Sequence, residues 1–140
     1  MIVYLVRHAS AGHRPSWSGD DRLRPLDDRG RRQADALVDQ LRGRDFKRIV
    51  SSPYVRCVES VVPLAHARGM AVEHADALAE GAGAEAALAL FRSARVPLVA
   101  CVHGDLCQEL LGEKTKKGST TVLELQGDAV QVRERLPRQA

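Results

Sequence analysis

The sequence predicts an α/β domain in which helices cover both faces of a mainly parallel central sheet. Its 140 residues contain three short runs rich in apolar residues, at 2–6, 48–51 and 97–102. The first and third runs have no polar face, which is typical of strands buried on both sides of a parallel sheet. Segments with helical periodicity separate the runs, and this alternation favours a three-layer α/β/α sandwich. The length is ordinary for one domain, so residues 1–140 are expected to form a single unit.

The first run is followed by a long loop and then by a helix. Residues 9–26 are polar and hold several glycines and prolines, which indicates a loop whose length usually has a functional reason. Asp27 or Asp28 can cap a helix that continues to about Arg42. Gly43 is the residue expected to end this helix.

The second run leads directly into another helix. Ser51 and Ser52 can cap it, and Pro53 suits its first turn. We expect the helix to end at Gly69. A kink is expected at Pro63, because a proline inside a helix lacks the backbone N–H that the helix needs.

The second half of the chain adds shorter elements of both kinds. They are a strand at 71–73, helices at 85–92 and 105–111, and a hairpin with strands at 121–125 and 130–133 that turns at Gly127-Asp128. The helices follow from the spacing of their apolar residues, and the hairpin follows from alternating polarity on either side of a glycine.

Composition excludes several classes of protein. The chain is 44% hydrophobic and 28% charged, so neither a disordered nor a membrane protein is expected. Residues 2–6 are too few to span a bilayer and lack the basic lead of a signal peptide, so a cytoplasmic location is expected. A net charge of +3 and 4% aromatic residues are too low to predict nucleic acid as a partner. The three cysteines lack CxxC spacing, which favours reduced core thiols.

Two histidines and two arginines follow the three predicted core strands. Arg7 and His8 follow the first strand, Arg56 comes shortly after the second, and His103 follows the third. Ligands of such sheets bind outside the carboxyl ends of the strands, so we expect these four side chains to meet there. Arginine forks match phosphoryl oxygens through paired hydrogen bonds, and a neutral imidazole beside them can attack phosphorus. The sequence therefore predicts a site for phosphoryl transfer.

No metal or cofactor is expected at this site. Direct attack by a histidine needs no metal, and a histidine pair alone lacks the carboxylates or thiolates typical of magnesium or zinc sites. A phosphate or sulfate ion is the expected ligand of the pocket. Sequence order alone leaves open whether His8 or His103 is the attacking histidine.

Three segments carry the most specific motifs of the chain. They are Leu5-Val6-Arg7-His8-Ala9, Ser52-Pro53-Tyr54-Val55-Arg56, and a late apolar strand closing on His103-Gly104. Together they resemble the histidine phosphatase superfamily, in its phosphoglycerate mutase-like branch, over nearly the whole chain. The resemblance implies that His8 is the nucleophile and that Arg7, Arg56 and His103 hold the phosphoryl oxygens. Gly104 would let the backbone approach the phosphate.

The resemblance also implies a proton donor. In this family it is usually a glutamate between the second and third motifs, and Glu80 is our candidate, with Glu73 and Glu85 as competitors. An ester oxygen leaves poorly unless protonated, and the same carboxylate can then activate water. Ala9 stands where the family commonly has glycine. Arg-His-Ala is typical of the small bacterial phosphohistidine phosphatases of the SixA type.

The spacing of the motifs leaves no room for a large cap over the site. Only 22 residues separate Glu80 from His103, whereas mutases and sugar bisphosphatases of the family carry long insertions there. An uncapped site would admit bulky or protein-borne phosphates, which disfavours a mutase. Ser10 is a further candidate donor to a phosphoryl oxygen.

A second resemblance points to smaller substrates. Segments 17–26 and 117–120 are similar to the C-terminal phosphatase half of actinobacterial proteins that carry a Nudix hydrolase in front. Arg22, Arg24 and Lys117 would then contact the rest of the substrate. The expected partner is thus a phosphorylated substrate, either a phosphohistidine protein or, as the alternative, a nucleotide or other small phosphorylated metabolite. A catalytically silent phosphate-binding module is the alternative of another class.

Overall fold

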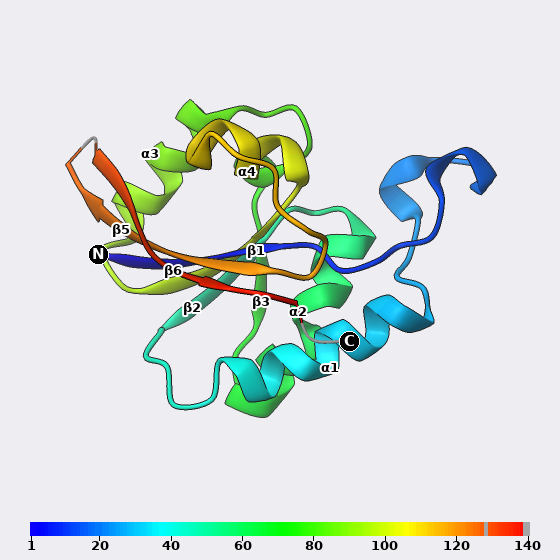
Figure 1. Ribbon diagram of the computed structural model, residues 1–140, viewed down its shortest axis with the longest axis horizontal. Coiled ribbons are helices and arrows are strands. Elements are labelled where there is room, and N and C mark those ends of the chain that lie inside the picture. Colours follow the sequence, from blue (N-terminus) through cyan, green and yellow to red (C-terminus); the bar gives the residue numbers. More distant parts are fainter. Residues whose placement is uncertain (128, 139–140) are drawn as a thin grey trace.

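The described residues form a six-stranded sheet with the order β3-β2-β4-β1-β5-β6 (Figure 1). The computed structural model describes residues 1–127 and 129–138. The strands are β1 (Ile2–Arg7), β2 (Arg48–Ser51), β3 (Val72–His74), β4 (Leu98–Val102), β5 (Thr120–Gln126) and β6 (Ala129–Leu136). Strands β1 to β4 pair in parallel, whereas β5 pairs antiparallel with β1 and β6 antiparallel with β5. The predicted mainly parallel sheet is confirmed.

Two helices cover each face of the sheet (Figure 1). The pairs are α1 (Asp28–Gln40) with α2 (Val55–Arg68), and α3 (Ala84–Ala94) with α4 (Gly104–Leu111). Side chains of β1 alternate between the two layers, because successive residues of a strand point to opposite faces. Val3 and Leu5 pack in the core beneath α3 and α4, whereas Tyr4 and Val6 pack in the core beneath α1 and α2. The three-layer α/β/α architecture is therefore confirmed.

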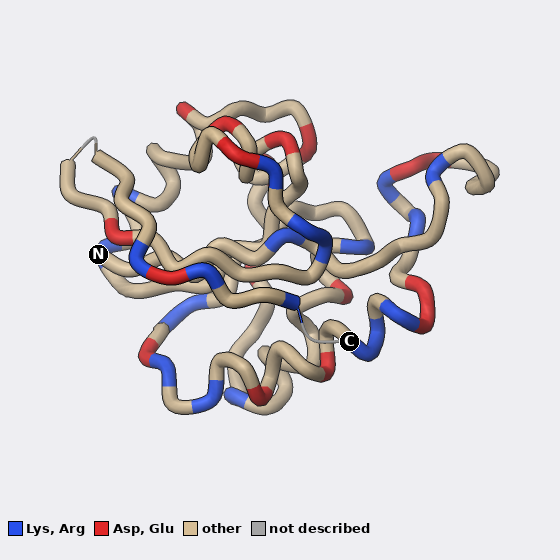
Figure 2. The backbone as a smooth tube through the Cα atoms, viewed as in Figure 1, with Lys and Arg blue, Asp and Glu red and all other residues tan. Residues whose placement is uncertain are grey.

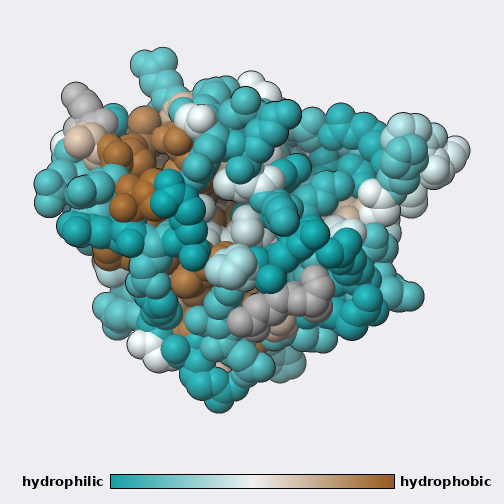
Figure 3. Space-filling view, viewed as in Figure 1, coloured by the Kyte–Doolittle hydropathy of each residue, from teal (hydrophilic) through white to brown (hydrophobic). Residues whose placement is uncertain are grey.

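The surface is mostly hydrophilic in the view of Figure 3. Apolar side chains show at the left of that view, over α3 and the β5–β6 hairpin. None of the helices among the described residues combines the length and the apolar character needed to cross a membrane.

Helix α2 begins later than the sequence predicts. Ser51 is the last residue of β2, and Tyr54 occupies the N-cap position without a capping side-chain hydrogen bond. The Ser52 hydroxyl accepts from the backbone of the N-cap residue Tyr54 at 3.3 Å, and it also lies 2.9 Å from Nε2 of His103. The helix is continuous through Pro63. The predicted cap at Ser51 and Ser52 is thus wrong: the Ser51 hydroxyl donates to the carbonyl of Ser52 at 2.8 Å, and the Ser52 hydroxyl interacts with His103.

The remaining predictions differ from the structure at the element ends. Helix α1 is capped by Asp27 and ends at Gln40 instead of Arg42. Helix α4 begins at Gly104 instead of residue 105, and Asp105 in its first turn accepts a hydrogen bond from the backbone of Gly81. The hairpin is present, with Gly127 at a φ of +59°. Asp128 and residues 139–140 of the predicted domain lie outside the described residues.

The predicted loop at residues 9–26 projects from the body and folds on itself (Figure 1, right). It contains two short 3-10 turns, η1 (Arg14–Ser16) and η2 (Asp21–Leu23). Its start is fixed to α1 through Asp27, whose carboxylate accepts hydrogen bonds from the Ser10 hydroxyl at 2.7 Å and from the Gly12 backbone at 2.9 Å. The loop is therefore anchored beside the carboxyl end of β1.

Candidate active site

Most of the predicted site residues meet in one cavity at the carboxyl ends of the parallel strands. The cavity has a volume of about 470 Å³. The predicted residues that line it are Arg7, His8, Arg24, Arg56, Glu80, His103, Gly104 and Lys117. They come from strand ends, from the first turns of α2 and α4, and from three loops, so only the folded sheet brings them together.

His8 is held as a neutral ring with a defined tautomer. Its Nδ1 lies 2.8 Å from the carbonyl oxygen of Ala9, which can only accept, so Nδ1 carries the proton. Burial lowers the pKa of His8 to about 3. The ring is therefore uncharged at neutral pH, and its Nε2 keeps a free lone pair. A histidine in this state is suited to nucleophilic attack.

His103 is held through its other ring nitrogen. Its Nε2 lies 2.9 Å from the Ser52 hydroxyl, which also accepts a hydrogen bond from the Tyr54 backbone at 3.3 Å. The hydroxyl has one proton of its own, and when it donates this proton to Nε2 the ring proton of His103 is on Nδ1. Nδ1 is buried and has no hydrogen-bond acceptor among the described residues. The ring centroids of His103 and His8 lie 5.5 Å apart.

Arg56 is buried and Arg7 is partly buried, and both are fixed by their terminal nitrogens. Arg56 is 1% exposed and donates to the Asp21 carbonyl at 2.8 Å and to the Glu80 carboxylate at 2.8 Å. Arg7 donates to the carbonyl of Thr115. In each arginine the Nε is buried and has no acceptor among the described residues. Each guanidinium therefore keeps an unsatisfied donor beside His8.

The cavity is strongly basic. Its charged lining consists of Arg7, Arg14, Arg24, Arg56, Lys114 and Lys117 against Glu80 and Asp105. Figure 2 shows basic positions gathered where the loop after α4 passes the end of β1. Burial lowers the pKa of Lys117, and the charges of the neighbouring arginines, Arg7 foremost, lower it further. Such a cavity favours a ligand with more than one negative charge.

Glu80 lies in the wall of this cavity and is paired with two arginines. Its carboxylate accepts from Arg14 at 2.9 Å and from Arg56 at 2.8 Å, and it lies 3.6 Å from Nδ1 of His103. The competing candidates lie elsewhere. Glu73 pairs with Arg48 on the outer strands, and Glu85 does not line the cavity.

Two predicted residues are not brought to the cavity. The Ser10 hydroxyl donates to Asp27 at 2.7 Å, away from the cavity lining. Arg22 is exposed and pairs with Asp20 at 2.6 Å. The path of loop 9–26 decides both positions, and local sequence patterns do not encode this path.

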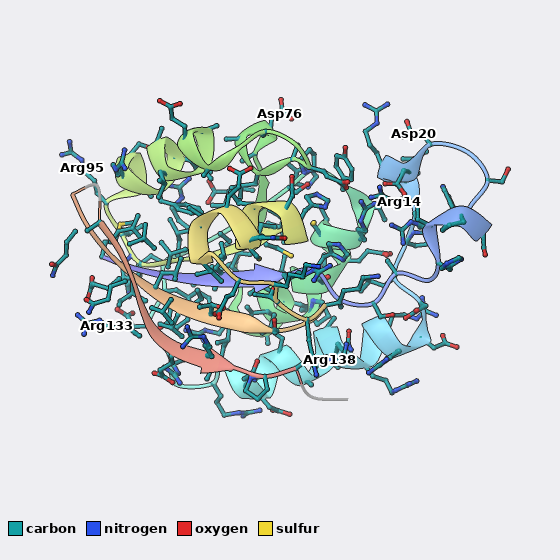
Figure 4. All side chains as sticks on the ribbon, turned by 45° about the horizontal axis from the view of Figure 1, so that its top comes forward. Arg14, Asp20, Asp76, Arg95, Arg133 and Arg138 are labelled. Atoms are coloured by element: carbon teal, nitrogen blue, oxygen red, sulfur yellow. The ribbon has the colours of Figure 1, made fainter. Side chains whose placement is uncertain are left out.

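The sequence reading missed two residues that organise the site. Arg14 lines the cavity. Asp21 does not line it but contacts Arg56, which does. Figure 4 shows Arg14 on the arm that projects beside the body. The available signal was the density of arginines and aspartates in residues 14–24, which alone does not separate surface charges from site residues.

The described residues contain no group of three or more His, Cys, Asp and Glu side chains arranged to hold a metal ion. Cys57, Cys101 and Cys107 are buried free thiols, as the sequence predicts. The absence of metal and cofactor from the reaction stays a prediction.

The comparison with known families shows the family of this chain. A family model, the histidine phosphatase superfamily (branch 1), matches residues 3–89. The chain belongs to this superfamily. Both the predicted resemblance and the predicted enzyme class, a phosphatase, are confirmed.

Several members of the histidine phosphatase superfamily resemble this chain. An 8-oxo-(d)GTP phosphatase of Mycolicibacterium smegmatis is 36% identical over 145 residues, which cover 88% of this chain and 44% of that protein. The chain thus spans less than half of the length of that relative. Two solved structures share the fold. The SixA phosphohistidine phosphatase of Agrobacterium tumefaciens has a TM-score of 0.78 at 23% identity, covering 96% of this chain and 97% of the other. The alpha-ribazole-5'-P phosphatase of Escherichia coli K-12 has a TM-score of 0.82 at 15% identity, covering 97% and 96%.

Proposed function

We propose that this histidine phosphatase transfers a phosphoryl group first to Nε2 of His8 and then to water, without a metal. The supporting observation is a set of three buried donors without acceptors, Nε of Arg7, Nε of Arg56 and Nδ1 of His103, around the neutral His8. A buried donor without a partner destabilises the fold by about 1–3 kcal/mol. A phosphoryl group has three oxygens that would satisfy these donors, so the cavity is suited to its binding.

The reaction then proceeds in two steps. In the first step the Nε2 lone pair of His8 forms a bond to phosphorus while the bond from phosphorus to the leaving oxygen or nitrogen breaks. Glu80, which takes up a proton once the phosphoryl oxygens of the substrate replace its carboxylate as the partner of Arg56, gives this proton to the leaving atom. In the second step water attacks phosphorus, the N–P bond breaks, and Glu80 takes a proton from the water. His8 returns to its neutral form and inorganic phosphate is released.

The substrate that best fits an open cavity is a phosphomonoester or a phosphohistidine on a protein. Half of the lining residues project from loops, and within the described residues no insertion covers them. A phosphohistidine substrate has a better leaving group than an ester, so it would depend less on Glu80.

A nucleotide or other small phosphorylated metabolite is the second candidate. The cations that the phosphoryl group does not need, Arg14, Arg24, Lys114 and Lys117, line the same cavity. They would pair with a further phosphate of a nucleoside di- or triphosphate. The name of the Mycolicibacterium relative, an 8-oxo-(d)GTP phosphatase, supports this class.

Phosphate release from a panel of substrates tests the proposal. The panel holds a phosphohistidine protein, nucleoside di- and triphosphates and sugar phosphates, without added metal. Wild-type protein is compared with His8→Ala and with His74→Ala, a control whose histidine is exposed and outside the cavity. We expect His8→Ala to reduce turnover by at least about 10³-fold, because the nucleophile is lost, and His74→Ala to retain it.

The possible outcomes separate the candidates. The best substrate of the panel chooses between the protein and the nucleotide. Turnover that survives in His8→Ala would exclude the covalent mechanism. If the wild type binds phosphate but turns over no substrate, the protein is a catalytically silent phosphate-binding module.

A further inference from the structure

Asp21 is the only residue of the projecting loop whose carboxylate meets three arginines among the described contacts. Its Oδ1 accepts from Nε of Arg24 at 3.0 Å. Its Oδ2 lies 3.1 Å from a terminal nitrogen of Arg56 and 3.3 Å from one of Arg14. Its backbone carbonyl accepts a second bond from Arg56 at 2.8 Å. One residue thus joins three cationic side chains of the cavity wall.

From these contacts we infer that Asp21 is a positioning residue, which aims the three arginines at the substrate without touching it. The inference rests on the proposed function of the cavity. Asp21 does not line the cavity, whereas Arg14, Arg24 and Arg56 all do. A carboxylate in that place acts on the reaction only through the guanidinium groups it holds.

The orientation of Arg56 depends most directly on this contact. Its side chain is 1% exposed, so its charge is costly unless paired and hydrogen-bonded. Asp21 and Glu80 bind its two terminal nitrogens, whereas its Nε is buried without an acceptor among the described residues. Two independent contacts from Asp21, by carbonyl and by carboxylate, fix the plane of the guanidinium. The Nε–H of Arg56 therefore points in a single direction, in which a phosphoryl oxygen can accept its hydrogen bond.

Asp21 also reduces the repulsion among the clustered cations. Burial alone would raise the pKa of Asp21, but the hydrogen bond from Arg24 and the charges of Arg56 and Arg14 keep it below its usual value. The carboxylate therefore stays ionised at neutral pH. Glu80 shares Arg14 and Arg56 with it but lies in the cavity wall, where an incoming phosphate competes for the same guanidiniums.

The variant Asp21→Asn separates positioning from simple charge. It keeps the shape of the side chain but removes the negative charge and turns an N–H donor toward an arginine. If only charge mattered, the more positive cavity would bind phosphate more tightly. If Asp21 positions Arg56, kcat should fall by roughly 10- to 100-fold, because a misplacement of about 1 Å can reduce a rate by that much, while phosphate binding is not tightened.

Asp20→Asn is the matched control. Asp20 is the adjacent residue with the same side chain, but its carboxylate pairs with the exposed Arg22 and contacts no residue of the cavity lining among the described contacts. Figure 4 shows Asp20 on the projecting arm. An asparagine at this position can still accept the capping hydrogen bond from the Arg22 backbone, so kcat and KM should stay within twofold of wild type.

NMR of the arginine Nε–H groups provides a test that needs no turnover. Inorganic phosphate should shift the Arg56 Nε–H signal of the wild type and of Asp20→Asn. In Asp21→Asn this signal should start from a different position and respond at least several-fold less. Thermal unfolding of each variant shows whether the protein is folded at the assay temperature.

The result that overturns the inference is an Asp21→Asn variant with wild-type kcat and a wild-type Arg56 signal. A variant that binds phosphate more tightly with unchanged kcat would also overturn it, in favour of charge alone. If the wild type turns over no substrate, the proposed function fails, but the phosphate-induced signals still decide whether Asp21 orients Arg56.

Discussion

Gly104 packs so closely against the side chain of Arg7 that any larger residue at this position would overlap with it. A Cβ at Gly104 would lie 2.8 Å from Cζ of Arg7 and 2.9 Å from one of its terminal nitrogens. The backbone of Gly104 is not in the left-handed region, so the glycine serves close approach and not conformation. Arg7 cannot retreat freely, because it is bonded to the Thr115 carbonyl.

We expect Gly104→Ala to reduce kcat/KM by about tenfold or more, because Arg7 must leave its place beside His8. Stability should change by less than about 1 kcal/mol, since alanine favours a helix over glycine by a similar amount. Steady-state kinetics and urea unfolding of the same preparation measure the two effects. Unchanged kinetics would mean that Arg7 does not need its present position.

The sequence predicted the residues at strand ends but not those in the long loop. Arg7, His8 and His103 follow directly from the rule that ligands bind at the carboxyl ends of parallel strands. Ser10 and Arg22 were misplaced because a loop has no periodicity that fixes where its side chains point. Asp21 was missed for the same reason.

At the scale of elements, helix α1 and the start of loop 9–26 fit together through one glycine. A Cβ on Gly30 would lie 1.9 Å from the carbonyl oxygen of Ser10 and 2.9 Å from its carbonyl carbon. These are backbone atoms, and the same carbonyl accepts a hydrogen bond from the Asp27 backbone at 3.1 Å. The contact sets how closely the loop lies on the helix.

Gly30→Ala should lower the free energy of unfolding by about 1–3 kcal/mol, because overpacking outweighs the better helix propensity of alanine. Arg32→Ala on the exposed side of the same helix is the control, with an expected change within about 0.5 kcal/mol. Chemical denaturation measures both. A Gly30→Ala protein as stable as the control would show that the loop can move away without loss.

Element types were predicted better than element ends. Buried apolar runs and helical periodicity identified the strands and helices, because burial imposes these patterns on the sequence. The start of α2 was misplaced because the Ser52 hydroxyl interacts with His103, 51 residues away in sequence. No local signal distinguishes this use of a serine from a helix cap.

At the scale of the whole molecule, the layered fold was predictable because the alternation of strands and helices restricts the possible architectures. The strand order was not predicted. It places β1 and β4 side by side at the centre, which brings His8 and His103 together although they lie 95 positions apart in the sequence. Because His8 is buried and neutral in the folded protein, the free energy of unfolding depends on pH. The same residue thus affects both the reaction and the stability.

The direction of this pH dependence follows from His8. Its pKa is lowered from 6.5 to about 3 by burial. Below pH 6.5 the unfolded chain binds a proton that the folded chain does not, so stability falls as the pH falls and levels off only below about pH 3. The carboxylates with lowered pKa, such as Asp21 and Asp27, act in the same direction, but only at the more acidic pH where carboxyl groups titrate.

Between about pH 6.5 and 5, His8 should therefore reduce the free energy of unfolding by up to about 1.4 kcal/mol per pH unit. Urea unfolding of the wild type, His8→Asn and His66→Asn across this range tests the prediction, with His66 chosen because it is exposed. In His8→Asn the free energy of unfolding should depend less steeply on pH, by the equivalent of about one bound proton. In His66→Asn the dependence should be that of the wild type. An equal slope in all three proteins would mean that His8 binds its proton as readily in the folded chain as in the unfolded chain, so that the fold does not hold the ring neutral.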